Sequence, residues 1–422
     1  MEKKICVNNI LITTCQIIFG LTFLFSGFVK AVDPMGSTFK FIDYFRVFDL
    51  TFLNGSAQFF AVVLAALEFT LGASILFGCY KRIAPIAGVL FMAFFTPFTL
   101  YLAIKNPVSD CGCFGDALVI TNWQTFWKNV FLLIIIVFLF LNRKKIRSPF
   151  LVSTRWFAVF YAFVFSIVIS LIGLYYLPII DFRPFKNGVN IEQDMAIPSN
   201  NDKEYVLVYE KNGAKKNFTL ENYPANDSTW VFVESKEISK TQKSEPKISN
   251  FILSNENGED ITSEILNKAG YTFLLISPDL NEANENAVNK ISLLYDYALA
   301  HDYNFYGLTV NDQQIIKDWR ESTGAEYEFI YSDATILETI TRANPGIVLL
   351  KDGIILWKKG PNNLPLEDEL EAPLNENELG EIVKNHPLKT ILLSILLFFT
   401  PILLLLLFEK GFVKLVEKIR KK

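Results

Sequence analysis

Six long apolar stretches constrain the fold of this chain more than any other feature. Each holds about 20 mostly apolar residues, the length that a helix needs to cross about 30 Å of hydrocarbon. They run approximately from Ile10 to Val29, Ala57 to Phe77, Ile83 to Ile104, Trp123 to Leu141, Trp156 to Leu177 and Leu388 to Phe408. The first stretch is long for a cleaved signal peptide and has no clear small-x-small site, so we predict an uncleaved anchor. The sequence therefore predicts six membrane-spanning helices.

Lysine and arginine mark one side of these predicted spans. Clusters lie before the first span, between the second and third, between the fourth and fifth, and after the sixth: Lys3 and Lys4, Lys81 and Arg82, Arg143 to Arg147, and Lys410 to Lys422. Short cytoplasmic loops carry this excess of positive charge. We therefore predict a bacterial cytoplasmic (inner) membrane protein with both termini in the cytoplasm. The loops Val32 to Ser56 and Asn106 to Asn122, and residues 181–387, are predicted to be extracytoplasmic.

The charge balance divides the chain in the same way. The whole chain has 422 residues and a net charge of −4, but the segment 181–387 has 19 basic against 35 acidic residues. The remainder has 21 basic against 9 acidic residues, and these basic residues punctuate apolar runs. This distribution excludes a single ordinary soluble domain and a disordered chain. It also argues against nucleic-acid binding, which needs basic residues gathered on a folded face.

The long acidic segment has the pattern of a folded region. Tyr205 to Tyr209 and Trp230 to Val233 predict short strands of a β-rich lead-in, followed by a linker at Lys240 to Ser249. From Ile248 strands and helices alternate, and the chain then reaches a hairpin around a Lys-Asp-Gly turn. The predicted strands are Asn250–Ser254, Tyr271–Ser277, Asn304–Val310, Gly346–Leu350 and Ile354–Trp357; the predicted helices are Glu282–His301, Gln313–Ser322 and Asn375–Lys384. This order predicts an α/β domain.

This order, with the stretch Arg342 to Gly353, resembles the thioredoxin fold over about residues 248–384. The resemblance implies that Pro345 is the cis-proline of a partner-binding face. An ordinary trans proline in a turn is the alternative. Ser277 to Glu282 stands where that family carries Cys-x-x-Cys, and no cysteine follows Cys113. We therefore predict a domain that binds an extended polypeptide or a redox partner without doing thiol chemistry itself.

The five cysteines fall into two groups. Cys6, Cys15 and Cys79 lie in or beside apolar stretches, where cysteine is usually a small core residue. Cys111 and Cys113 lie in a predicted extracytoplasmic loop, where thiols can be oxidised. A Cys-Gly-Cys disulfide would be strained and therefore inclined to exchange. A static disulfide and a pair of reduced thiols remain alternatives. A metal site lacks further ligands, because His301 and His386 are the only histidines and lie in a distant segment.

A second resemblance involves the membrane part. Asp110 to Asp116 (DCGCFGD), with Phe25 to Pro34 and Leu67 to Gly72, resembles the MauE family of the DoxX-like membrane proteins over about residues 8–145. The resemblance implies a four-helix unit. It also implies a role in the maturation of a disulfide-rich extracytoplasmic enzyme beside a thioredoxin-like partner.

Glu68 lies near the middle of the second predicted span, where an ionised carboxylate is costly. It is a candidate proton carrier for thiol or quinone chemistry, with Lys30, Gln16 or Ser26 as partners. A protonated acid that makes an interhelical hydrogen bond is the alternative. The phenylalanines that would line a cleft for a quinone, the one cofactor considered, are Phe19, Phe23, Phe91, Phe94, Phe95 and Phe98.

The predicted fold class is a membrane all-α helical bundle with an extracytoplasmic α/β thioredoxin-like domain. The predicted divisions are a four-helix unit (1–145), a fifth span (146–180), the β-rich lead-in (181–247), the thioredoxin-like domain (248–387), and a sixth span with a basic tail (388–422). The predicted function is extracytoplasmic thiol-disulfide exchange, or maturation of exported proteins, through Cys111 and Cys113, as a thiol-disulfide oxidoreductase component. A client protein or a thiol-redox partner, and membrane lipid, are the expected partners. The alternatives are a scaffold with a structural loop disulfide, and a transporter built around Glu68, for which no inverted repeat is visible.

Overall fold

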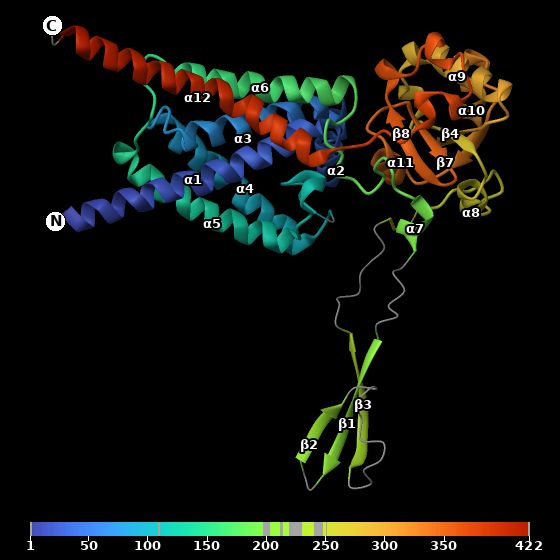
Figure 1. The fold of residues 1–422 in the computed structure, drawn as a ribbon, viewed down its shortest axis with the longest axis horizontal. Coiled ribbons are helices and arrows are strands. Elements are labelled where there is room, and N and C mark those ends of the chain that lie inside the picture. Colours follow the sequence, from blue (N-terminus) through green and yellow to red (C-terminus); the bar gives the residue numbers. More distant parts are fainter. Residues whose placement is uncertain are drawn as a thin grey trace.

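The computed structural model describes residues 2–108, 110–196, 203–211, 214–218, 230–239, 248–249 and 251–420. Its largest parts are a helical bundle and an α/β unit at one end of that bundle (Figure 1). Within the described residues, six helices are long and apolar enough to cross a membrane. They are α1 (Glu2–Val32), α3 (Ala57–Leu76), α4 (Ile83–Lys105), α5 (Asn122–Leu141), α6 (Arg155–Tyr175) and α12 (Pro387–Arg420). The prediction of six apolar helices is confirmed.

The bundle is built from pairs of neighbouring helices. Helix α1 packs along α3, α4 packs along α5, and α6 packs against α1 and α3. Helices α1 and α3 approach closely at Gly27 and Gly72, where an added Cβ would lie 2.5 Å from the Phe69 nitrogen and 2.6 Å from the Leu24 nitrogen, respectively. Small residues at such positions let helix backbones approach closely in a membrane. Both chain ends lie at the end of the bundle away from the α/β unit (Figure 1).

The predicted loop between the first two spans is largely helical. It forms α2 (Pro34–Val47) and a 3-10 turn over Thr51–Ser56. Asp33 caps α2 by accepting a hydrogen bond from the Gly36 backbone N–H at 2.9 Å, and Pro34 follows at the first helical position. An aspartate before a proline is a helix-start signal. Helix α2 therefore covers the end of the bundle that faces the α/β unit.

The α/β unit contains a five-stranded mixed sheet in the order β6-β5-β4-β7-β8. Strands β4 (Tyr271–Ile276), β5 (Asn304–Thr309) and β6 (Glu328–Tyr331) are parallel to one another. Strand β7 (Gly346–Lys351) runs antiparallel to β4, and β8 (Ile354–Lys359) runs antiparallel to β7. The helices of this unit are α8 (Thr262–Leu266), α9 (Val288–Ala300), α10 (Gln313–Thr323) and α11 (Ala334–Ile340). Side chains of β4 alternate between two cores, with Phe273 in one and Leu274 in the other. The sheet is therefore buried on both faces, as predicted for an α/β domain.

Several predicted elements of this unit differ in the structure. No strand forms over 251–254; Ser254 makes only isolated bridges to Asp260 and Tyr331. The helix predicted from Glu282 begins at Val288, after 3-10 turns over 280–282 and 285–287 that are capped by Asp279 and Asn284. Strand β6 and helix α11 were not predicted.

The helix predicted over 375–384 is also absent. The segment forms two 3-10 turns, over Leu374–Glu376 and Glu378–Gly380. The Asn377 side chain accepts a hydrogen bond from the Leu379 N–H, and the Trp357 indole N–H donates to the Leu379 carbonyl at 2.7 Å. These bonds use backbone groups that a continuous helix would need.

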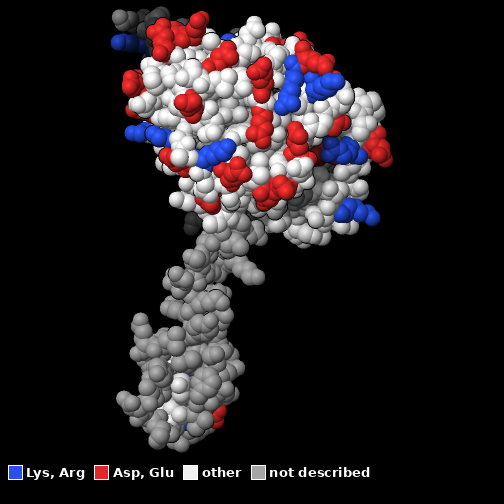
Figure 2. Space-filling model, turned by 90° about the vertical axis from the view of Figure 1, so that its right-hand side faces the viewer, with Lys and Arg blue, Asp and Glu red and all other residues white. Residues whose placement is uncertain are grey.

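The remaining described elements form the lead-in. Helix α7 (Ile191–Met195) is followed by an antiparallel sheet in the order β2-β1-β3, with β1 (Lys203–Lys211), β2 (Ala214–Phe218) and β3 (Val231–Ser239). The predicted strands at 205–209 and 230–233 fall within or beside β1 and β3. The predicted linker lies mostly outside the described residues. Figure 2 shows acidic side chains spread over the exposed face of the α/β unit, with fewer basic ones.

Candidate thiol site at one end of the bundle

Cys111 and Cys113 lie in the loop between α4 and α5, with their Sγ atoms 2.9 Å apart. Cys111 is buried and Cys113 is half-buried. Gly112 between them has a φ of +62°, and an added Cβ would lie 3.0 Å from the Lys40 side chain. Glycine is therefore the residue that lets the two sulfurs approach in so short a turn.

Helix α2 holds this loop in place. Lys40 forms an ion pair with Asp110 at 2.9 Å, and Asp110 also accepts a hydrogen bond from the Gly112 N–H at 2.8 Å. The Tyr44 hydroxyl donates to the Cys111 carbonyl at 2.8 Å. Because the anchors come from a separate helix, the position of the cysteines depends on α2.

A buried charged cluster lies beneath Cys113. Lys30 of α1 donates to Glu68 Oε2 at 2.7 Å, to Ser26 Oγ at 2.8 Å and to the Cys113 carbonyl at 2.7 Å. Ser26 Oγ lies 2.7 Å from Glu68 Oε2. Of the three partners predicted for Glu68, Lys30 and Ser26 contact it, whereas Gln16 donates to the Ile75 carbonyl instead. The structure thus brings Lys30, Glu68 and the cysteine loop into one site.

A cavity of about 260 Å³ opens beside this cluster. Its polar lining includes Ser26, Lys30, Glu68, Cys111 and Cys113, and also Lys40, Lys128 and Asn129. The rest of its lining is mostly apolar, and five of the six predicted phenylalanines belong to it: Phe23, Phe91, Phe94, Phe95 and Phe98. Phe19 is fully buried in the bundle core instead.

The two cysteines differ in acidity. Hydrogen bonding by the Cys113 thiol, with a smaller contribution from the Thr125 hydroxyl, lowers the pKa of Cys111 to about 6, although burial opposes this shift. The same hydrogen bond, together with burial, raises the pKa of Cys113 well above its ordinary value. Cys111 is therefore the thiolate of the pair at neutral pH, and thiolates are the reactive form.

This difference predicts the pH dependence of alkylation. Cys111 is expected to react with iodoacetamide at a rate that is half-maximal near pH 6 and falls below it, because the thiol is then protonated. An ordinary cysteine would lose reactivity below about pH 8.5. Peptide mass spectrometry across this range measures the rate at each site. Cys79, whose pKa burial raises to about 11, serves as the unreactive control. A midpoint for Cys111 near pH 8.5 would contradict the assignment.

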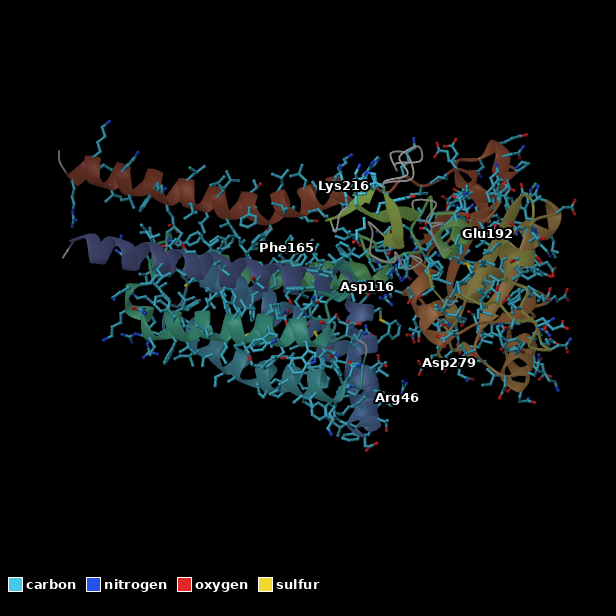
Figure 3. All side chains as sticks on the ribbon, turned by 90° about the horizontal axis from the view of Figure 1, so that it is seen from below. Arg46, Asp116, Phe165, Glu192, Lys216 and Asp279 are labelled. Carbon is cyan, nitrogen blue, oxygen red and sulfur yellow. The ribbon has the colours of Figure 1, made fainter. Side chains whose placement is uncertain are left out.

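Arg342 joins the α/β unit to this end of the bundle. Its guanidinium, 7% exposed, lies 3.0 Å from Asp33 Oδ2 and 2.7 Å from Asp116 Oδ2. Asp33 is the cap of α2, and Asp116 follows the cysteines by three residues. Figure 3 shows Asp116 at the end of the bundle that faces the α/β unit. Sequence reasoning missed these three residues, although Asp33 and Asp116 both stand in the motifs quoted for the membrane part.

The predicted cis-proline has the expected geometry, since the Asn344–Pro345 bond is cis. Next to it, Asn344 accepts a hydrogen bond from the Ser277 hydroxyl at 2.6 Å and donates to the Asp279 carbonyl at 2.7 Å. The structure therefore places Asn344, the residue before Pro345, beside the segment Ser277–Asp279. A partner-binding role for Pro345 stays a prediction.

A groove of about 340 Å³ separates this loop from α2. Asp279, Glu282 and Asn344 line it on one side, and Met35 and Phe39 line it on the other. Within the described residues, no group of three or more His, Cys, Asp or Glu side chains is placed to hold a metal ion.

Two family models match parts of this chain. Residues 8–142 match the family described as methylamine utilisation protein MauE, and residues 203–241 match a domain of unknown function (DUF8463). Protein TlpB of Flavobacterium psychrophilum is 26% identical over 136 residues, which cover 31% of this chain and 37% of that protein. No solved structure matches. The match to the MauE family and the six apolar helices together support a multi-pass membrane protein.

Proposed function

We propose that this protein carries out extracytoplasmic thiol-disulfide exchange at the bacterial cytoplasmic membrane, with Cys111 and Cys113 as the exchanging pair. The observation that carries the proposal is the 2.9 Å approach of the two sulfurs, in a loop held by α2 and facing the α/β unit. The basic clusters of the sequence orient both termini to the cytoplasm and this loop to the outside.

The unequal acidity of the two cysteines gives the exchange a direction. In the oxidised protein, a client thiolate attacks the half-buried Cys113 sulfur and Cys111 leaves as a thiolate. A low pKa makes Cys111 the better leaving group. A second client thiolate then attacks the client sulfur of the mixed disulfide and releases Cys113, which takes up a proton. The client gains a disulfide, and the protein gains two reduced cysteines.

The α/β unit supplies the place for the client. Its own sequence has no cysteine, so its part in the reaction is binding. The groove between Asn344 and α2 opens at the same end of the bundle as the cysteine loop, and Arg342 fixes the two parts together. An extended segment of a client in this groove would lie close to Cys113.

Differential alkylation in intact cells tests the proposal. The wild-type Cys111–Cys113 pair is expected to switch between modified and protected forms when cells receive reductant and then oxidant. The double variant C111S/C113S is expected to accumulate exported clients with unpaired thiols. The matched control is Cys79→Ser, which removes a buried cysteine of the same bundle. A pair that keeps one redox state, with a double variant indistinguishable from wild type, would overturn the proposal.

A membrane scaffold is the second candidate, because the α/β unit has no cysteine but is anchored firmly through Arg342. A scaffold predicts a stable co-purifying partner that C111S/C113S retains, with no change in client thiols. An exchange protein predicts instead that Cys111→Ser alone leaves client thiols unpaired, as C111S/C113S does, because no disulfide can then form for the client thiolate to attack.

A further inference from the structure

We infer that the cavity beneath Cys111 and Cys113 binds a membrane quinone, which takes two electrons from the reduced pair and restores its disulfide. The inference rests on the proposed function, because it supplies the oxidant that the exchange needs. It is carried by the size of the cavity, by its access from the lipid, and by the placement of its polar groups.

The size of the cavity suits a ring headgroup. Its volume of about 260 Å³ lies just below the range of about 300–1,000 Å³ for small-molecule sites. It is therefore adequate for a substituted ring but too small for a whole long-chain lipid. A quinone has this shape, with a compact ring and an apolar tail that can remain in the bilayer.

The rim of the cavity is apolar and exposed. Phe94, Phe48 and Leu50 line the cavity and are also 65%, 39% and 37% exposed. Phe94 belongs to α4, and the other two follow α2. Since α4 is one of the apolar spanning helices, the Phe94 side of this rim faces lipid. A ligand that reaches the cavity this way must be lipid-soluble.

The walls are aromatic and suit a flat ring. Phe91 stacks on Phe95 with ring centroids 4.4 Å apart, and Phe23 meets Phe91 edge to face at 5.3 Å. Aromatic rings favour offset-stacked and edge-to-face contacts with one another. These side chains thus offer flat faces and ring edges to a quinone placed between them.

The polar end of the cavity supplies groups for oxygen atoms and protons. Lys30 is 6% exposed and Glu68 is 6% exposed, and both line the cavity next to Cys113. A buried ammonium stabilises negative charge that develops on a quinone oxygen. Lys30, Ser26 and Glu68 are connected by hydrogen bonds, so a proton given up at Lys30 Nζ can be replaced through Ser26 or Glu68.

The reaction balances in electrons and protons. The Cys111 thiolate and the Cys113 thiol form one Sγ–Sγ bond, Cys113 gives up its proton, and two electrons pass to the quinone ring. The Cys113 proton and a second proton, given by Lys30 Nζ and restored from water, end on the two quinone oxygens and give the quinol. No further oxidant is needed, and the quinol leaves to the bilayer by the apolar rim.

The test uses the full chain in lipid nanodiscs, with both cysteines first reduced. Decylubiquinone and 2,3-dimethyl-1,4-naphthoquinone are the probes, and quinol formation and thiol loss are followed together. We expect one quinol for each pair of thiols lost with at least one of the probes. Leu64→Trp places a bulky ring in the cavity and should slow this reaction about tenfold or more, because it fills the binding space. Leu67→Trp, on the same helix but 53% exposed and outside the cavity, is the matched control.

A water-soluble oxidant separates the two proposals. Diamide should oxidise the pair at the same rate in wild type, Leu64→Trp and Leu67→Trp. If diamide oxidises the pair but neither quinone is reduced, or if both Trp variants slow quinone reduction equally, the quinone inference is wrong and the exchange proposal stands. If diamide leaves both cysteines reduced, the exchange proposal fails and the quinone inference fails with it.

Discussion

Replacing Arg342 by alanine is expected to release the α/β unit from the bundle. The guanidinium pairs with the Asp33 carboxylate, which is 11% exposed, and with Asp116, which is 38% exposed. It also donates to the Glu338 carbonyl at 2.8 Å. Removing one partner of a buried ion pair costs about 3–5 kcal/mol, because the other charge stays desolvated. Here part of that cost is relieved by separation of the two parts, which returns Asp33 and Asp116 to water.

Hydrogen exchange and the alkylation rate of Cys113 measure the release. In R342A, amides at the start of α2 and around Gly115–Ala117 should lose protection, and Cys113 should be alkylated faster. The matched control is Lys317→Ala on α10, because Lys317 is 66% exposed and forms an ion pair with Glu321 of its own helix at 3.7 Å. Equal protection in R342A and wild type would contradict the role assigned to Arg342.

This release would also separate holding a client from exchanging thiols. The Cys111–Cys113 loop is anchored by Lys40 and Tyr44 further along α2, whereas Arg342 pairs with Asp33 at the start of that helix. R342A should therefore keep diamide oxidation of the pair while it weakens transfer of the disulfide to a client. Loss of both activities together would mean that Arg342 supports the loop itself.

The sequence predicted the site residues where a residue type is unusual in its surroundings, either because burying it costs free energy or because of its neighbours. Glu68 and Lys30 stand in apolar helices, and Cys111 and Cys113 stand in a loop with glycine between them. Each signal is local, so all four residues were predicted, and the structure brings them together. Arg342 carries no such signal, because its partners lie 309 and 226 residues away and an arginine in a polar segment is ordinary.

The same reasoning explains the missed elements of the α/β unit. Strand β6 has only four residues and an exposed first position, so it has neither a long apolar run nor a clear alternation. Its place is decided by pairing with β5. The turns over 374–380 are fixed by contacts of Leu374 and Leu379 with the core and by the Trp357 hydrogen bond, which are tertiary interactions. The two asparagines and the glycine of this segment are also poor helix formers, so the predicted helix had little support from propensity.

The buried pair of Lys30 and Glu68 gives the second large prediction. Glu68→Leu leaves the Lys30 ammonium, 7% exposed, without its counter-charge in the bundle. We expect a loss of about 3–5 kcal/mol in the free energy of unfolding. Lys30→Met should cost a similar amount, because the Glu68 carboxylate, 8% exposed, then lacks its cation. Unfolding by SDS titration in mixed micelles measures these losses.

The double variant K30M/E68L decides whether the pair is structural or also takes part in the reaction. Replacing both charges by apolar side chains should recover most of the stability, because no desolvated charge remains. A double variant as unstable as the sum of the single ones would contradict the pairing. With the fold recovered, diamide oxidation of Cys111 and Cys113 should be retained, whereas quinone reduction should be slow, since the cavity has lost the buried cation beside Cys113 and its carboxylate proton carrier. Quinone reduction at the wild-type rate in this double variant would assign Lys30 and Glu68 to stability alone.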